Sequence, residues 1–314
     1  MAKIAILAET MRKTQAIVSY AQEQLKEHEL TIPSFESRLS NIEIANIISK
    51  QDAIVVGREA IDSDMLKNSN QLKAIAKYGV GLDKIDIETC KKLGIRLYLQ
   101  DGMNADCVAE FAVGLMLSLT RRISFSDNQM RQGIWNKDGG FLLTGKTVGI
   151  VGCGHIGSRV AKILRSSFQC QVLINDCLDK KEFAQKIGAK QVGLEELFIA
   201  ADFVSLHIPL NNETRKLIGP ALLGKMPSSS CLINTSRGEV IDQKALKGAL
   251  QSRKIRGAAL DVYEEEPLMD AELAALPNLI CTPHIAGSAQ ETIRKLSVYA
   301  IDSIRDFFTS ENAQ

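Results

Sequence analysis

A glycine-rich stretch in the middle of the chain, VGIVGCGHIG at residues 148–157, limits the fold more than any other part of the sequence. An apolar run leads into three glycines with the spacing G-x-G-x-x-G, at Gly152, Gly154 and Gly157, and a helical pattern with one apolar face follows. A strand, a tight turn and a helix in this order present backbone N–H groups and the positive end of a helix to a phosphate. The stretch therefore predicts a dinucleotide-binding turn.

An aspartate at the end of the next apolar run supports this interpretation. The run QVLIND ends in Asp176, about 20 residues after Gly157, which is the spacing expected for a ribose-binding carboxylate. A carboxylate at this place accepts hydrogen bonds from ribose hydroxyls and repels a 2′-phosphate. We therefore expect NAD as the cofactor.

Strand-like and helix-like segments alternate on both sides of the glycine turn. In the first hundred residues the apolar runs KIAIL, DAIVVG, KAIAKYG and GIRLYL alternate with longer stretches such as IVSYAQEQLKE and DSDMLKNSNQLK. The pattern restarts at TVGIVG and continues through QVLIND, FVSLHIP, SCLINTS, GAALDV and LICTPH. Such alternation predicts parallel sheets covered by helices, so we expect an α/β protein with two Rossmann-like, doubly wound domains.

Two longer helical patterns stand out from the rest. One runs from Asn104 to Trp135 without a proline, which is too long for one ordinary helix, and we expect a break at Gly114 or Ser124. The other is SAQETIRKLSVYAIDSIRDFF near the C-terminus. Its pattern alone does not decide which of the two domains it packs on.

Composition argues against several other classes of protein. The 38 basic and 37 acidic side chains are nearly balanced, which gives no support to a nucleic-acid or membrane-surface role. The N-terminus lacks the long apolar region of a signal peptide, and the most apolar helical stretch, 111–119, is about half as long as a membrane span. Seven cysteines without a C-x-x-C motif indicate reduced thiols. We expect a cytoplasmic protein with no metal site.

In the second half of the chain, most side chains that could bind a ligand or exchange a proton follow predicted strands. Ligands of doubly wound sheets bind at the carboxyl ends of the strands, so these side chains are candidates for one site. Besides the glycine turn, the set comprises Asp176, His207, Thr235, Ser236, Arg237, Asp261 and His284.

Three charged or titratable residues suggest the chemistry. The planar guanidinium of Arg237 suits a substrate carboxylate, although a surface arginine is an equally good interpretation. Glu266 differs from the two glutamates before it because Pro267 follows and restricts its backbone. His284 can exchange a proton near neutral pH. Beside a dinucleotide site, these three predict hydride transfer between an alcohol and a carbonyl carbon.

Several motifs run in order over nearly the whole chain: KYGVGLDKIDI, NADCVAE, GKTVGIVGCGHIG, the strand-end Asp176, HIPLNNETRKLI, INTSRGEVID, GAALDVYEEEP and NLICTPHIAG. Together they resemble the D-isomer-specific 2-hydroxyacid dehydrogenases, and within them the D-3-phosphoglycerate dehydrogenase-like members. The resemblance implies NAD-dependent hydride transfer at carbon 2 of a D-2-hydroxyacid or 2-keto acid, with 3-phosphoglycerate among the candidate substrates.

The resemblance also implies roles for individual residues. Arg237 would orient the substrate, His284 would be the acid–base and Glu266 its partner. Cofactor contacts would come from Val80, Gly152, Gly154, His155, Ile156, Gly157, Asp176, His207, Ile208, Pro209, Thr235, Ser236, Asp261 and Gly287. Substrate contacts would come from Arg58, Lys77, Tyr78, Gly79, Gly81 and Asn104. Arg58 and Lys77 are candidate anchors for a second anionic group, with ordinary surface cations as the alternative.

A domain organisation follows from the same resemblance. It implies an NAD-binding Rossmann domain at 102–287, inserted in a discontinuous, flavodoxin-like substrate-binding domain at 1–101 and 288–314. It implies a homodimer built around the long helical region and Trp135, and a small-molecule substrate with no nucleic-acid or membrane partner. We also expect no additional regulatory domain.

Two departures from the family pattern and several alternatives remain. Asp101 stands where a proline is usual, and Lys77 stands where phosphoglycerate-type members often have arginine; a lysine is a point charge rather than a fork. A glyoxylate/hydroxypyruvate reductase is the main alternative enzyme. An NAD-sensing, corepressor-like binding protein would keep the same three residues. Use of NADP would require a cation in place of Asp176.

Overall fold

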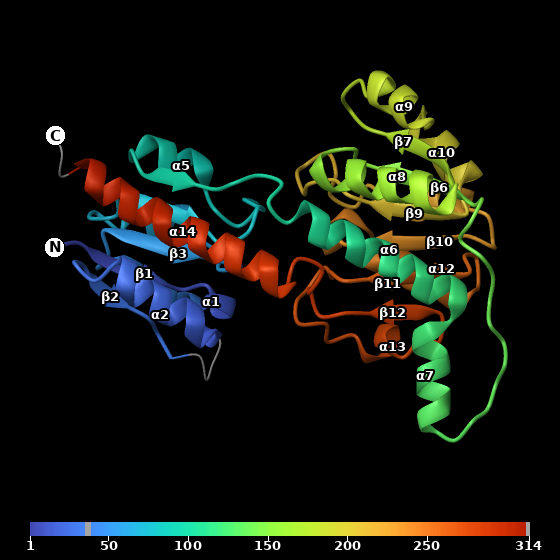
Figure 1. The fold of residues 1–314 in the computed structure, drawn as a ribbon, viewed down its shortest axis with the longest axis horizontal. Helices are drawn as coiled ribbons and strands as arrows, with labels where there is room; N and C mark the ends of the chain where they lie inside the picture. The colour runs from blue at the N-terminus through green and yellow to red at the C-terminus, as the bar shows by residue number, and fades with distance from the viewer. Residues whose placement is uncertain (35–38, 312–314) are drawn as a thin grey trace. The chain divides into compact units, whose positions relative to one another are not determined.

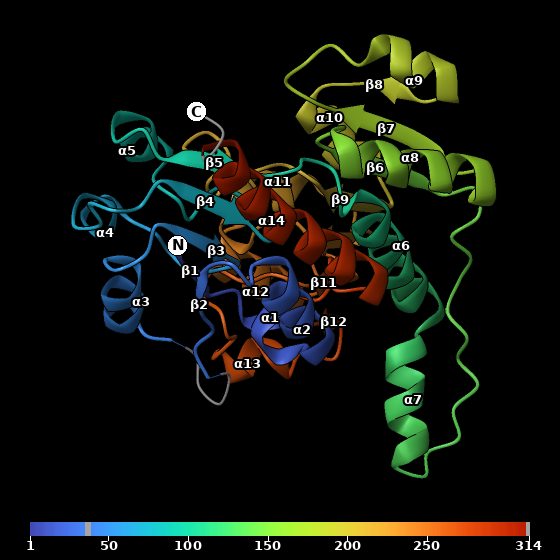
Figure 2. The same ribbon diagram turned by 60° about the vertical axis from the view of Figure 1, so that its left-hand side comes forward.

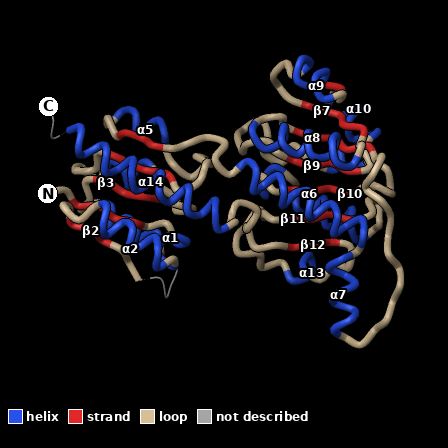
Figure 3. Tube along the Cα trace, viewed as in Figure 1, coloured by secondary structure: helices blue, strands red, loops and turns tan. Residues whose placement is uncertain are grey.

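A computed structural model describes residues 1–34 and 39–311. The chain divides into two compact units, one formed by Met1–Asn104 with Ser288–Gln314 and the other by Ala105–Gly287. Each unit contains one parallel sheet with helices on both faces (Figures 1 and 3). The expectation of an α/β protein with two doubly wound parallel sheets is therefore confirmed.

The first unit has a five-stranded sheet with the order β2-β1-β3-β4-β5. Its strands are β1 (Lys3–Ile6), β2 (Glu29–Thr31), β3 (Ala53–Val56), β4 (Ala74–Lys77) and β5 (Arg96–Tyr98). All four apolar runs of the first hundred residues form strands. The edge strand β2 is missing from the sequence-based expectation because it is short and partly polar, with no buried residue.

Two helical layers cover this five-stranded sheet. One face carries α1 (Glu9–Lys13), α2 (Gln15–Gln24) and α14 (Gln290–Glu311), and the other carries α3 (Asn41–Ile48), α4 (Ser63–Lys67) and α5 (Ile87–Lys92). The C-terminal helix α14 lies against α2 and β4 and buries Ala300, Ile301 and Ile304 there (Figure 1). The question that the sequence pattern left open is thus answered, because α14 belongs to the first unit.

The second unit has a seven-stranded sheet with the order β12-β11-β10-β9-β6-β7-β8. The strands are β6 (Thr147–Val151), β7 (Gln171–Asn175), β8 (Lys190–Gln191), β9 (Phe203–Leu206), β10 (Cys231–Asn234), β11 (Gly257–Leu260) and β12 (Leu279–Cys281). After β6 the chain first builds β7 on one side and later β9 on the other. The carboxyl ends of β6 and β9 therefore form the point where ligands of such sheets bind.

Helices cover both faces of the seven-stranded sheet as well. One face carries α6 (Ala105–Arg121), α8 (His155–Phe168) and α9 (Lys181–Ile187). The other carries α10 (Leu194–Ala200), α11 (Pro220–Lys225), α12 (Gln243–Gln251) and α13 (Ala271–Ala274), and a short 3₁₀ turn lies at Gly238–Val240. No helix within the described ranges is long and apolar enough to cross a membrane.

The long helical pattern breaks at Arg122, which has a left-handed φ of 54°. Helix α6 ends one residue earlier, and α7 (Ile123–Arg131) extends away from the sheet (Figure 2). The expected breaks are wrong, because Gly114 lies inside α6 and Ser124 inside α7. The cause is a tertiary contact, since the returning chain donates its Phe141 N–H to the carbonyl of Thr120 at 2.9 Å.

Candidate active site

The glycine turn between β6 and α8 is tightly packed beneath and open above. A Cβ on Gly157 would lie 1.9 Å from the carbonyl oxygen of Gly152, so only glycine fits there. Gly154, the N-cap of α8, has no described atom within 4 Å of the place of a Cβ. The first turn of α8 therefore offers its backbone N–H groups on an open side. This arrangement fits the pyrophosphate of a dinucleotide.

Asp176 follows β7 and lies beside the glycine turn. One carboxylate oxygen, Oδ2, accepts a hydrogen bond from the N–H of Cys153 at 2.7 Å, and Oδ1 accepts one from Leu178 at 2.8 Å. These bonds fix the carboxylate at the edge of the turn, while its remaining lone pairs can still accept hydrogen bonds from hydroxyls. The position fits the ribose of NAD.

Two buried polar atoms at neighbouring strand ends have no hydrogen-bond partner among the described residues. His207 follows β9, and its Nε2 lies 2.9 Å from the hydroxyl of Ser205. Burial lowers the pKa of His207 to about 3, so the ring is neutral. Within the described residues, Nδ1 of His207 and the buried Oγ1 of Thr235, which follows β10, have no hydrogen-bond partner. Buried polar groups are nearly always paired, so both atoms indicate a ligand at this edge.

The loop after β10 presents Arg237. The buried side chain of Asn234 organises this loop, because its Oδ1 accepts hydrogen bonds from the N–H and the hydroxyl of Ser236 at 3.0 and 2.8 Å. Its Nδ2 donates to the carbonyl oxygen of Arg237 at 2.8 Å. The arginine side chain bends back so that Nη1 lies 2.7 Å from the carbonyl of Ser236. The backbone that carries the guanidinium is therefore fixed from below.

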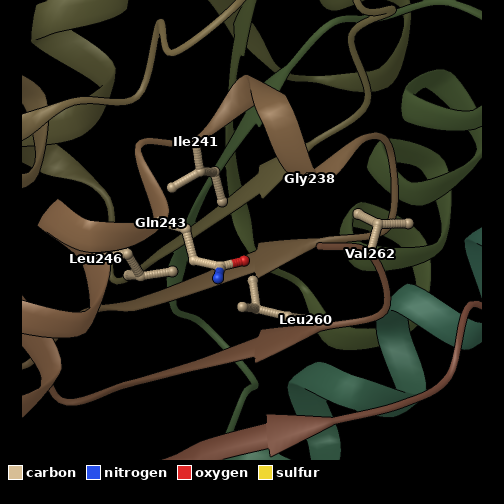
Figure 4. Close-up of a pocket in the computed structure, with 6 residues that line it drawn as sticks. All are labelled: Gly238, Ile241, Gln243, Leu246, Leu260 and Val262. Atoms are coloured by element: carbon tan, nitrogen blue, oxygen red, sulfur yellow. The ribbon is translucent and has the colours of Figure 1, made fainter. Parts of the chain in front are cut away.

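The Arg237 loop packs directly on the loop after β11. A Cβ on Gly238 would lie 1.9 Å from the carbonyl carbon of Tyr263, so the two backbones are in close contact. Gln243 and Glu264 join the same segments, since each accepts a hydrogen bond from the other's N–H, at 3.2 and 3.3 Å. Figure 4 shows the small, mainly apolar pocket beneath them, lined by Gly238, Ile241, Gln243, Leu246, Leu260 and Val262.

The side chains of Glu266 and His284 lie within hydrogen-bond distance of each other. Nδ1 of His284 lies 2.9 and 3.0 Å from the two carboxylate oxygens of Glu266. The histidine has a left-handed φ of 56°, and its side chain is 30% exposed. Among the described residues its Nε2 has no hydrogen-bond partner. One ring nitrogen, Nδ1, thus contacts a carboxylate, while the other, Nε2, is able to exchange a proton.

The structure brings the second unit's predicted residues to one edge of one sheet. The turn from Gly152 to Gly157 with His155 and Ile156, then Asp176, His207 with Ile208 and Pro209, Thr235–Arg237, Asp261, Glu266 and His284 with Gly287 all follow strand ends of the seven-stranded sheet. Asp261 and Thr235 are buried there. No group of three or more His, Cys, Asp or Glu side chains among the described residues could hold a metal ion.

The other predicted residues belong to the first unit. Arg58 follows β3, and Tyr78, Gly79, Val80 and Gly81 follow β4, whose last residue is Lys77; Asn104 ends this part of the chain. Lys77 is only 6% exposed, and its Nζ donates to the carbonyl oxygen of Gly57. Arg58 is 51% exposed at its side chain and lies 4.0 Å from Glu9. The two candidate anion anchors thus have different surroundings.

Sequence reasoning missed several residues that hold this site in place. Asn234 and Ser205 support the two neighbouring strand ends, and Thr282 donates its hydroxyl to Asp261 at 2.6 Å. A signal existed for the first two, because each is a polar residue inside a strand whose other residues are apolar and buried. No comparable signal marks Thr282, because its partner lies 21 positions away.

Comparison with known proteins identifies the family. Residues 113–286 match the family model described as D-isomer specific 2-hydroxyacid dehydrogenase, NAD binding domain. A glyoxylate reductase of Korarchaeum cryptofilum is 34% identical over 307 residues, which cover 95% of this chain and 92% of that protein. A D-3-phosphoglycerate dehydrogenase of Archaeoglobus fulgidus is 37% identical over 257 residues, but this chain spans only 49% of its length.

Solved structures agree with this identification. The crystal structure of D-lactate dehydrogenase from Aquifex aeolicus, complexed with NAD and lactic acid, matches with a TM-score of 0.86 and 27% identity. The match covers 99% of this chain and 96% of that one. The chain therefore belongs to the D-isomer specific 2-hydroxyacid dehydrogenase family and is an NAD-dependent enzyme of that family.

Proposed function

We propose that this enzyme exchanges a hydride at carbon 2 of a short, unphosphorylated D-2-hydroxyacid or 2-keto acid, such as glyoxylate or hydroxypyruvate. The observation that carries the reaction type is the pair formed by Glu266 and His284 at the sheet edge that also bears the dinucleotide turn. A proton-exchanging group beside a hydride-exchanging cofactor is what interconversion of an alcohol and a ketone requires.

Each residue of the site has one task in this reaction. Bound NAD, held by the glycine turn and Asp176, would supply or accept the hydride. Arg237 holds the substrate carboxylate through its planar fork and stabilises negative charge on the oxygen at carbon 2. In reduction, Nε2 of His284 gives its proton to that oxygen, and in oxidation it takes the proton back. The carboxylate of Glu266 orients the ring through Nδ1.

The surroundings of Lys77 support an unphosphorylated substrate. A phosphate anchor needs an accessible cation, whereas this ammonium group is buried and donates to the carbonyl oxygen of Gly57. Turning it toward a phosphate would leave that carbonyl without this partner in a buried place. The surroundings of Lys77 therefore do not favour a substrate phosphate there.

A panel of 2-keto acids tests this substrate assignment. NADH oxidation is measured with glyoxylate, hydroxypyruvate and phosphohydroxypyruvate under identical conditions. We expect kcat/KM for one of the unphosphorylated acids to exceed that for phosphohydroxypyruvate by about tenfold or more, the cost of one unmatched polar contact. A preference for phosphohydroxypyruvate would contradict the substrate assignment. NADH binding with no turnover of any 2-keto acid would contradict the proposed reaction itself.

A second candidate substrate is 3-phosphoglycerate, and one observation favours it. Arg58 is exposed and suited to a phosphate, although Glu9 lies 4.0 Å away and offsets part of its charge. If Arg58 binds a phosphate, Arg58→Ala should raise KM for phosphohydroxypyruvate about tenfold and leave KM for glyoxylate unchanged. Equal effects on both substrates would exclude a phosphate-specific contact.

We also propose that the protein is a cytoplasmic homodimer. Helix α7 has no buried residue, and with the segment after it exposes Ile123, Met130, Ile134, Trp135 and Leu142. A second copy of the chain would remove these apolar side chains from water. All seven cysteines are free thiols, as in a reducing compartment. Sedimentation equilibrium should give twice the monomer mass, and Trp135→Ser should weaken association; a monomeric wild type would contradict the proposal.

A further inference from the structure

Asp261 is a fully buried carboxylate at the carboxyl end of β11. Its backbone N–H donates to the carbonyl oxygen of Asn234 at 3.0 Å, which continues the pairing with β10. Burial raises the pKa of this carboxyl group, while hydrogen bonds from its neighbours act in the opposite direction. A carboxylate in such a place requires partners that compensate its desolvation.

Among the described residues, the hydrogen-bond partners of the Asp261 carboxylate all come from the segment that carries His284. Oδ1 accepts hydrogen bonds from the hydroxyl of Thr282 at 2.6 Å and from the N–H of Ile285 at 2.9 Å. Oδ2 accepts one from the N–H of Ala286 at 2.8 Å. The bonded residues thus stand on both sides of His284 along the chain. The segment from 282 to 286 wraps around one carboxylate group.

The backbone of this segment needs such support. His284 has a left-handed φ of 56°, a conformation that non-glycine residues adopt only when their surroundings hold them there. Its N–H donates to the carbonyl of Thr282 at 3.1 Å, which makes a tight turn. The hydroxyl of Tyr263 lies 3.0 Å from the same carbonyl and ties the start of the turn to β11.

We propose that Asp261 is a positioning residue that holds the His284 turn in the conformation in which Nδ1 meets Glu266. Hydrogen bonds to a charged acceptor are stronger than neutral ones, and here three of them converge on one buried group. The inference rests on the proposed acid–base role of His284. It differs from the cofactor contact that the family resemblance implies for Asp261.

The two roles predict different kinetics for Asp261→Asn. An asparagine replaces one acceptor oxygen by a donor that faces another N–H, so the turn loses part of its support. If Asp261 positions His284, kcat falls by about 10- to 100-fold, as displacements of about 1 Å in an active site do. The Kd for NADH, measured by fluorescence without substrate, then changes less than about threefold. A rise of Kd with kcat unchanged would overturn the proposal.

Substitutions of Thr282 test the same proposal with Asp261 left intact. Thr282→Val keeps the shape and removes only the hydroxyl that donates to the carboxylate, whereas Thr282→Ser keeps that donor. We expect kcat to fall about tenfold in the valine variant and to stay within about twofold of wild type in the serine variant, since one charge-assisted hydrogen bond is lost or kept. Unchanged kcat in Thr282→Val would overturn the proposal, even if Asp261→Asn fails to fold.

Backbone hydrogen exchange in the ligand-free protein provides a readout that does not depend on turnover. The N–H groups of Ile285 and Ala286 should exchange at least about tenfold faster in Asp261→Asn, because local opening becomes easier. Asp202→Asn is the matched control, since Asp202 accepts the N–H of Thr147 at 2.9 Å at the opposite edge of the sheet. It should affect exchange at Thr147 and leave kcat and the His284 turn unchanged.

This exchange experiment separates the two proposals from each other. If the wild type reduces no 2-keto acid, the proposed reaction fails, while faster exchange at Ile285 and Ala286 in Asp261→Asn still supports the positioning role. Equal exchange at these two N–H groups in wild type and Asp261→Asn would overturn the positioning role, whatever the substrate.

Discussion

His207 and His284 both follow strands of the seven-stranded sheet, β9 and β12, yet their surroundings differ. The ring of His207 contacts the Ser205 hydroxyl, and burial lowers its pKa to about 3. The ring of His284 contacts the Glu266 carboxylate and is 30% exposed. The first is therefore a neutral hydrogen-bonding group, and the second is suited to exchange protons. The neighbouring carboxylate and the access to solvent make this difference.

Replacing each histidine gives the largest expected contrast. His284→Ala should lower kcat/KM for the preferred 2-keto acid by about 10³-fold, because general acid–base catalysis contributes about 10²- to 10⁴-fold. Its Kd for NADH should stay within about threefold of wild type. His207→Ala serves as the comparison and should affect NADH binding more than kcat. A larger loss of kcat in His207→Ala than in His284→Ala would reverse the roles given to the two residues.

Replacing Glu266 tests the contact with a carboxylate that His207 lacks. Glu266→Gln keeps the size of the side chain but loses the charged acceptor that orients the His284 ring through Nδ1. We expect kcat for reduction at neutral pH to fall by about 10- to 100-fold, which is less than the loss of the ring itself. The kcat values of wild type and variant, measured at saturating NADH, check this. Activity within twofold of wild type would show that the carboxylate is dispensable.

Arg237 lies in the loop after β10, and its replacement tests whether substrate binding is separate from proton exchange. Arg237→Lys keeps the positive charge and loses the bidentate fork. We expect KM for the 2-keto acid to rise about tenfold, while the pH dependence of kcat stays as in wild type. Steady-state kinetics at several pH values measure both. A changed pH dependence with constant KM would contradict this division of tasks.

The last expected effect concerns stability at low pH and leaves activity at neutral pH unchanged. Because the pKa of His207 is lowered from 6.5 to about 3, the unfolded chain takes up a proton below pH 6.5 that the folded protein does not bind. The free energy of unfolding therefore decreases as the pH is lowered through this range. At pH 5 this group makes it about 2 kcal/mol smaller than at neutral pH. Urea unfolding of wild type and His207→Gln at pH 7.5 and 5.0 measures it. An equally steep fall in the variant would contradict the neutral state of the ring.

The fold was predictable where strands are apolar and central. Runs such as TVGIVG and SCLINTS become β6 and β10 because their residues are buried on both faces of a parallel sheet. The edge strands β2 and β8 carry no buried residue, so no apolar run announces them. The break at Arg122 depends on the contact between Thr120 and Phe141, which the local pattern does not contain.

The site divides in the same way. Glycine spacing and strand-end positions bring Asp176, Arg237 and His284 to one sheet edge, because topology alone fixes where strands end. The hydrogen bond of the buried Lys77 and those between Asp261 and the His284 turn join residues about 20 or more positions apart in the chain. Such contacts follow from packing and leave no local sequence pattern.

The kcat/KM for reduction by His284→Ala, Glu266→Gln and the double variant tests the central claim most directly. Nε2 of His284 gives the proton, and the Glu266 carboxylate acts through the ring that it contacts at Nδ1. The kcat/KM of the double variant should therefore stay within about threefold of that of His284→Ala, because residues that act as one unit have non-additive effects. A double variant that loses the product of the two single effects would contradict the account.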